Sequence, residues 1–260
     1  MPFLTDDGEP LAELGLAQRP SAAPRFELTA AFTYLDPETG RRYRVPARHE
    51  ASLRQAQDDA GPLADFSTDL ASVPTPLWGM IASYGRQSAP AVLHDARSRE
   101  AAALGDDRAA LVQRREDDRV FHTGLREQGV PRLRARLMQT WVAADRERQF
   151  GGVRGWALVV QAVVGAVALV AASVAAWWNP WWLVAWPIVA LAVFVHGRLA
   201  GLVATLTFSL ALLGPFVLVQ LAALVPFRLV EALVELVTRG DPGGVWRPTL
   251  QPGSEDQGQP

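Results

Sequence analysis

The sequence contains no cysteine, which excludes disulfide bonds, thiolate nucleophiles and zinc sites built on cysteine. It contains no lysine either, so all 25 basic residues are arginine. This bias, together with abundant alanine, valine and glycine, is more typical of a GC-rich coding sequence than of arginine-specific chemistry. Since the net charge is −2, the composition indicates no nucleic-acid partner.

Acidic residues are absent between residues 156 and 227, where Arg198 and His196 are the only charged or titratable side chains. Three apolar runs fill this segment: Trp156–Trp178, Leu183–Val195 and Leu199–Val225. The first is long enough to cross about 30 Å of hydrocarbon. Because backbone polar groups in lipid must bond to one another, each run is predicted to be helical. The sequence therefore predicts an all-α transmembrane segment of about three helices over residues 155–226.

The charges around these runs predict their orientation. Arginines outnumber acids between Arg132 and Arg154, just before the first run, and Arg198 follows the second. Positive charge favours the cytoplasmic side, and the tryptophans of the turn at residues 177–182 are typical of the headgroup level. We therefore expect a multi-pass protein of the cell membrane, with the lipid bilayer as its partner and a cytoplasmic N-terminal domain. A re-entrant turn at Gly214-Pro215 would leave two spans and change the side of the C-terminus.

The ends of the chain have different compositions from this segment. The N-terminal sequence MPFLTDDGEP lacks the basic and apolar regions of a signal peptide. Residues 1–24 are rich in proline, alanine and acid and are predicted to be a disordered lead-in. Residues 227–239 have the pattern of an amphipathic helix, and residues 240–260 that of a disordered tail.

Residues 25–150 are predicted to form a soluble α+β domain. A β-hairpin is expected over Phe26–Val45, with its turn at Asp36–Gly40, followed by helices. The helix from about Ala109 to Gln128 should stop at Gly129. In the next helix, over Arg132–Phe150, an apolar stripe is expected to face the core with the arginines opposite: Leu133, Leu137, Trp141 and Ala144.

Three polar motifs in this domain contain candidate site residues. The segment Thr68-Asp69-Leu70-Ala71-Ser72-Val73-Pro74 has the composition of a turn leading into a helix. The pair His94-Asp95 follows an apolar run, and Asp118 and His122 follow on the next predicted helix. Two acids and an imidazole delivered in this way form a candidate site.

The order TDLASVP, then HD, then D-x-x-F resembles a phage-associated family catalogued as domain of unknown function 1353. The motif residues are Thr68, Asp69, Ser72, Pro74, His94, Asp95, Asp118 and Phe121. The resemblance extends over about residues 25–145, with an insertion at Arg48–Leu63 and without the aromatic residue and tyrosine that usually follow HD. It implies a domain whose biochemical activity is not settled, fused here to the apolar helices.

The HD pair and the later aspartate also resemble, more remotely, the arrangement of secretory phospholipase A(2). That resemblance implies His94 as a base that activates water, Asp95 as a metal ligand and Asp118 as the residue that orients His94. A second metal hypothesis adds His122, one helical turn after Asp118. The sequence requires no cofactor, and a divalent metal remains open.

A structural interpretation competes with both hypotheses. His94 and Asp95 can hold two helices together by pairing with Asp118 or an arginine, as buried polar groups commonly do. The chain lacks the disulfides and the glycine-rich calcium loop of the phospholipases, which favours this interpretation. We therefore expect a membrane-anchored structural or interaction module, and a membrane-tethered hydrolase of lipid or cell-envelope substrates is the alternative. Whether the chain is an enzyme, and whether it has a protein partner or self-associates, stay open.

Overall fold

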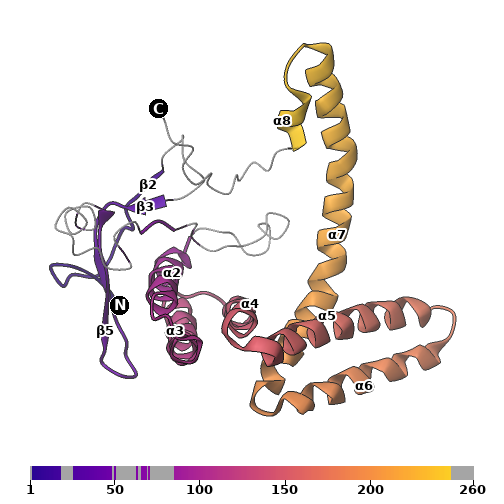
Figure 1. The fold of residues 1–260 in the computed structure, drawn as a ribbon, viewed down its shortest axis with the longest axis horizontal. Coiled ribbons are helices and arrows are strands. Elements are labelled where there is room, and N and C mark those ends of the chain that lie inside the picture. The colour runs from indigo at the N-terminus through magenta and orange to yellow at the C-terminus, as the bar shows by residue number, and fades with distance from the viewer. Residues whose placement is uncertain are drawn as a thin grey trace. The chain divides into compact units, whose positions relative to one another are not determined.

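The structure is a computed structural model, and it describes residues 2–18, 26–48, 50, 63, 66–68, 70 and 85–246. These residues fall into two compact units (Figure 1). One unit contains residues 1–88 and 217–260, and the other contains residues 89–216. The fold is α+β, with a small N-terminal β-region and a mostly helical remainder, as predicted.

The β-region contains two antiparallel sheets. The larger has the order β1-β4-β5, with β1 at Phe3–Thr5, β4 at Phe32–Leu35 and β5 at Arg42–Val45. The smaller pairs β2 (Leu16–Gln18) with β3 (Phe26–Leu28). The segment expected to be a disordered lead-in therefore supplies β1 and β2. Short strands of this kind carry little sequence signal, and β1 is held by long-range packing of Phe3 against Tyr34, with ring centroids 4.7 Å apart.

The hairpin of β4 and β5 forms around the predicted turn. Asp36 is fully buried, its carboxylate accepts hydrogen bonds from the backbone of Glu38 and the hydroxyl of Thr39, and its carbonyl accepts one from Gly40. Gly40 has a φ of 70°, a conformation that costs glycine little because it lacks a Cβ atom. These contacts set the register in which Tyr34 lies opposite Tyr43.

The polar helices of the second unit are α2 (Ser88–Ala102), α3 (Asp107–Glu127) and α4 (Arg132–Phe150). Asp106 caps α3, because its carboxylate accepts from the backbone N–H groups of Arg108 and Ala109. After α3 the chain turns at Gly129, which has a φ of 75°, where the stop was predicted. Figure 1 shows α3 beside α4.

The buried face of α4 differs from the predicted one. Of the expected apolar stripe, Ala144 is buried and Leu137 is half-buried, but Leu133 is 72% exposed and Trp141 38% exposed, so the stripe faces the core only in part. The buried face instead carries small residues and two charged ones: Ala135, Met138, Thr140, Ala143, Ala144, Arg146 and Glu147. Small side chains let neighbouring helices approach closely, and ion pairs satisfy the charges that this approach buries.

The apolar helices begin directly after α4, through a turn of glycines. They are α5 (Gly152–Ala175), the 3₁₀ segment η2 (Pro180–Val184), α6 (Ala185–Ala192), the 3₁₀ segment η3 (Val193–Leu199) and α7 (Ala200–Val237). Two segments are long and apolar enough to cross a membrane, Gly152–Ala175 and Pro180–Val237. The sequence had suggested about three. Gly197 has a φ of 54° and a ψ of −114°, which interrupts the helix inside the second segment.

Helix α7 is continuous over its whole length, whereas a turn was considered at Gly214-Pro215 and a separate amphipathic helix at residues 227–239. The chain stays helical through Gly214, Pro215 and Pro226 to Val237. A short helix, α8 (Pro242–Trp246), then lies in the segment expected to be disordered. Proline removes one hydrogen bond and strains the preceding turn, but neither proline breaks this helix.

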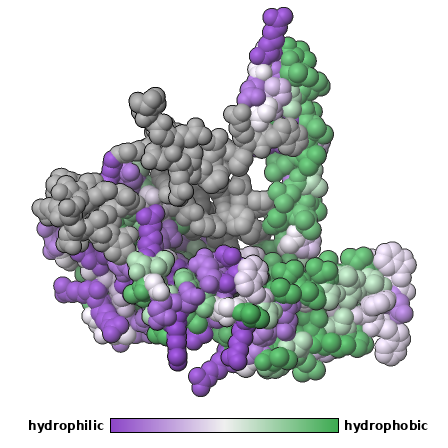
Figure 2. Space-filling view, viewed as in Figure 1, coloured by the Kyte–Doolittle hydropathy of each residue, from purple (hydrophilic) through white to green (hydrophobic). Residues whose placement is uncertain are grey.

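Helices α5, α6 and the first half of α7 pack together around small residues. A Cβ atom on Gly165 of α5 would lie 3.0 Å from Thr207 Cγ2 on α7 and 3.2 Å from Val189 Cγ1 on α6. Glycine at this position therefore permits the close approach of all three. Figure 2 shows the surfaces of α5, α6 and α7 coloured mainly as hydrophobic.

Candidate functional site

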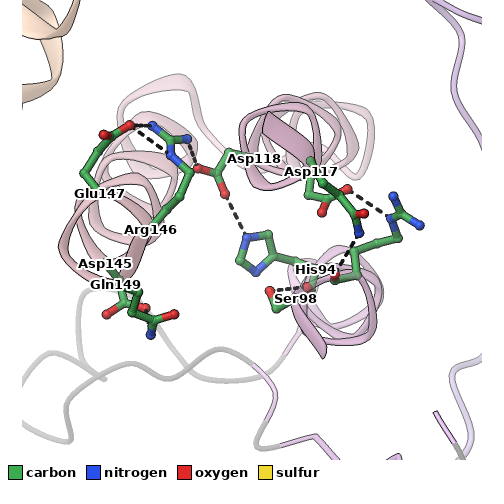
Figure 3. A network of polar contacts seen from close by, with 10 residues as sticks. His94, Ser98, Asp117, Asp118, Asp145, Arg146, Glu147 and Gln149 are labelled. Carbon is green, nitrogen blue, oxygen red and sulfur yellow. Dashed lines mark hydrogen bonds and ion pairs between the residues drawn. The ribbon is translucent and has the colours of Figure 1, made fainter. Parts of the chain in front are cut away.

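The predicted pair of His94 and Asp118 forms where α2 faces α3. The Nε2 atom of His94 lies 2.9 Å from Oδ1 of Asp118 (Figure 3). The His94 ring also packs against Phe121, with ring centroids 4.9 Å apart. His94 is 7% exposed and Asp118 is 2% exposed. The ring reaches this position because α2 is buried on every side from Ala89 to His94.

Arg146 of α4 completes the group on the other side of Asp118. Its NH1 atom donates to Oδ2 of Asp118, and its NH2 atom lies 2.8 Å from Oε1 of Glu147 (Figure 3). Arg115 of α3 contacts the same Glu147 oxygen at 3.3 Å. We call His94, Asp118, Arg146 and Glu147 the buried network; it connects α2, α3 and α4.

The contacts also indicate where the proton of His94 lies. Asp118 accepts a charge-assisted hydrogen bond from Arg146. An ionised carboxylate can only accept hydrogen bonds, so the Nε2 atom of His94 must donate to it. Asp118 therefore orients the imidazole and fixes its tautomer, whatever the role of His94.

A second ion pair lies beside the network. The Nε atom of Arg97 donates to Oδ1 of Asp117 at 3.0 Å. Burial raises the pKa of Asp117 above its ordinary value, and the neighbouring Arg97 opposes that shift. Its Oδ2 atom is buried without a hydrogen-bond partner among the described residues. Asp117 is thus a buried acid with one oxygen that lacks a partner among the described residues. In the adjacent Asp118 both carboxylate oxygens are hydrogen-bonded.

The two remaining predicted metal ligands, Asp95 and His122, lie on α2 and α3. Asp95 is half-buried on α2. His122 lies near Arg136 and Arg126, and its pKa is lowered by burial and then by these two positive charges. Over the described ranges, no group of three histidine, aspartate or glutamate residues is placed to hold a metal ion.

The turn motif lies in the other unit or outside the described residues. Thr68 is buried, forms an isolated bridge with Phe26, and its hydroxyl accepts from the backbone N–H of Leu70. Asp69, Ser72 and Pro74 lie outside the described residues.

Sequence reasoning missed Arg146 and Glu147. The larger apolar residues of α4 predict the opposite face as the core face, which puts Arg146 on the exposed side, and they assign no role to Glu147. The available signal was Ala135, which lies eleven residues before Arg146 and therefore on the same side of α4. The roles of Arg146 and Glu147 depend on distant partners, which periodicity does not reveal.

Asp118 and Arg146 also line a cleft of about 600 Å³. Its walls come from α3, α4, η3 and the beginning of α7. His94 is not among the residues that line it. The charged residues of its lining are Arg115, Asp118, Arg119, Arg136, Arg146 and Arg198.

Comparison with protein families gives one finding. Residues 61–143 match the family model described as "Protein of unknown function (DUF1353)". This range contains α2, α3, the HD pair and Asp118, and it ends within α4. No curated protein and no solved structure matches the chain.

Proposed function

We propose that the chain is a membrane-anchored structural or interaction module, in which the buried network holds α2, α3 and α4 together. The observation that carries this proposal is the burial of His94 on Asp118, away from the cleft that Asp118 and Arg146 line. A general base must reach the proton that it removes. A network that holds helices together needs only hydrogen-bond partners for its buried polar groups. The motif resemblance to phage-associated domains suggests a phage-derived module.

The apolar surface of α5, α6 and α7 supports the anchor. Val164 and Val167 on α5 are 62% and 63% exposed, and Leu212 on α7 is 75% exposed. Contiguous apolar surface of this extent is rare on soluble monomers and is typical of membrane-facing helices. Trp177 and Trp181, in the turn after α5, are 88% and 78% exposed, as interfacial anchors would be. The break at Gly197 favours three membrane helices over two.

Two hydrogen bonds of one side chain support the same arrangement. Gln161 of α5 donates to the carbonyl of Ala192 at 2.8 Å, and its side-chain oxygen accepts from Nε2 of His196 at 2.8 Å. The bond to Ala192 satisfies a carbonyl where the helical pattern changes to 3₁₀ geometry. Backbone groups at membrane depth require partners of this kind.

The anchor and its orientation can be tested by labelling cysteines, since the chain has none of its own. We expect Asn179→Cys to be labelled by an impermeant maleimide from outside intact cells, and Gln149→Cys to be labelled only after permeabilisation. Release of the chain from membranes by alkaline carbonate would contradict the anchor. Labelling of Gln149→Cys from outside would contradict a cytoplasmic N-terminal domain.

A hydrolase remains the second candidate because His94 is oriented by an acid at 2.9 Å. The two candidates differ in what His94→Gln does. In a module, this change leaves Asp118 with a weaker donor and destabilises the helices by about 1–3 kcal/mol. In a hydrolase, it removes the base and abolishes turnover.

We would measure thermal unfolding and hydrolysis of a fluorogenic ester-lipid panel, with and without divalent metal, for the parent and for His94→Gln. Asp118→Asn lowers stability in both candidates, because it removes the charge that pairs with Arg146, so only a loss of turnover in the folded protein would indicate that His94 acts as a base. His122→Gln is the control, since His122 lies outside the network. Parent hydrolysis that His94→Gln abolishes, with His122→Gln active, would refute the module.

A further inference from the structure

We infer that the arginine-rich cleft binds the phosphate headgroup of an anionic membrane lipid. The inference rests on the proposed membrane anchor and adds a ligand to it. Five arginines and one acid line the cleft: Arg115, Arg119, Arg136, Arg146, Arg198 and Asp118. A cavity with such an excess of guanidinium groups favours an anion.

Three of the five arginines already have carboxylate partners. Arg115 lies 3.3 Å from Glu147, and Arg119 lies 2.6 Å from Glu116. Arg146 lies between Asp118 and Glu147 in the buried network. These pairs position part of the cationic wall but leave less charge for a ligand.

Arg136 and Arg198 differ from these three, since within the described part of the chain neither has a carboxylate partner. The NH1 atom of Arg136 donates to the side-chain oxygen of Gln139 at 3.0 Å, which leaves its charge uncompensated. Arg198 is exposed and lies directly after the turn at Gly197. A phosphate group would supply the anion that both guanidinium groups lack, through charge-assisted hydrogen bonds.

The backbone brings these two arginines to one place. The NH2 atom of Arg136 would lie 3.8 Å from a Cβ atom on Gly201, so this guanidinium reaches the first turn of α7. Arg198 precedes that turn by two residues. The first turn of a helix carries partial positive charge, which adds to the field of the arginines. Arg136 and Arg198 therefore flank one end of the cleft.

The position and lining of the cleft favour a lipid over a soluble phosphate compound. The cleft lies where α6 ends and α7 begins, and Leu199 and Leu202 contribute apolar walls. In the proposed anchor, this end of the apolar helices is at the cytoplasmic surface, where anionic headgroups lie. Basic pockets at this level bind such headgroups, and about 600 Å³ lies within the size range of ligand pockets.

The experiment titrates phosphatidic acid into the full chain in neutral detergent and counts bound lipid by native mass spectrometry. Phosphatidylcholine with the same acyl chains tests for charge, and glycerol 3-phosphate tests for a soluble ligand. The variants are Arg136→Gln, Arg198→Gln and the double variant. Arg134→Gln is the matched control, because it removes the same charge from an exposed position of α4 that does not line the cleft.

We expect phosphatidic acid to bind more tightly than phosphatidylcholine, and each cleft substitution to weaken it roughly fivefold. The double variant should lose roughly twenty-five-fold if the contributions add, while Arg134→Gln changes binding less than twofold. Equal losses in Arg134→Gln and the cleft variants, or equal binding of the two lipids, would overturn the inference. Binding of glycerol 3-phosphate as tight as that of phosphatidic acid would overturn the lipid as the ligand.

A failure of the proposed membrane anchor can be distinguished from a failure of the lipid-binding inference. Carbonate extraction reports on membrane insertion and does not depend on the cleft. If the chain is released from membranes, the proposed anchor is wrong, and with it the lipid as the physiological ligand. If the chain stays in the membrane but Arg136→Gln and Arg198→Gln leave the affinity for phosphatidic acid unchanged, the anchor stands and the ligand inference is wrong.

Discussion

Replacing Arg146 with methionine tests whether the buried network holds the three polar helices together. Arg146 is 5% exposed and is the cation shared by Asp118 and Glu147, which are 2% and 4% exposed. Methionine fills part of the same volume but leaves two buried carboxylates without that partner. Breaking a buried ion pair by removing one member costs about 3–5 kcal/mol.

The neighbouring residues place the expected loss near the lower end of that range. His94 stays hydrogen-bonded to Asp118 at 2.9 Å and still satisfies one of its carboxylate oxygens. Arg115 stays near Glu147, although its side chain is 51% exposed and therefore compensates weakly. We expect the free energy of unfolding of the three helices to fall by about 3 kcal/mol. This change corresponds to roughly a hundredfold increase in the population of the open state.

Hydrogen exchange of the full chain in detergent measures this loss helix by helix. We expect the slowest amides of α2, α3 and α4 to exchange roughly a hundredfold faster in Arg146→Met, with little change in α5. The control is Arg148→Met on the same helix, whose exposed pair with Asp145 is worth at most about 1 kcal/mol. Adding Asp118→Asn and Glu147→Gln to Arg146→Met should restore much of the protection, because the stranded charges are gone. Equal exchange in Arg146→Met and Arg148→Met would refute the structural role of the network.

Three further predictions concern single positions. Gly155→Ala should speed exchange in α4, because its Cβ would lie 1.7 Å from the carbonyl oxygen of Glu147. Gly165→Leu should lower the melting temperature of the chain in detergent, because the side chain would meet Thr207, while Gly214→Leu, where the space is open, should have a smaller effect. Burial raises the pKa of Asp117, so its contribution to stability is full below the unfolded pKa of about 3.9 and is lost as pH rises through the folded pKa. Urea titrations over that range should show a smaller decline for Asp117→Asn, and an unchanged decline would contradict this.

The sequence by itself was sufficient for features that depend on neighbours along the chain. Hydropathy located the apolar segment, and turn chemistry located the hairpin at Asp36–Gly40 and the end of α3 at Gly129. The motif order indicated the unknown-function family, and residues 61–143 match its model. The pairing of His94 with Asp118 was implied by the resemblance to the phospholipases and was one of two options in the structural interpretation, and the structure shows it.

Only the tertiary structure decided which charges are buried and what they face. The larger apolar residues of α4 suggested one core face, yet helix packing buries the face with the small residues, and with it Arg146 and Glu147. The strand β1 and the cleft beside Asp118 likewise depend on residues far apart in the sequence. A charged side chain gains its role from a partner on another helix. Helical periodicity describes one helix at a time and carries no information about that partner.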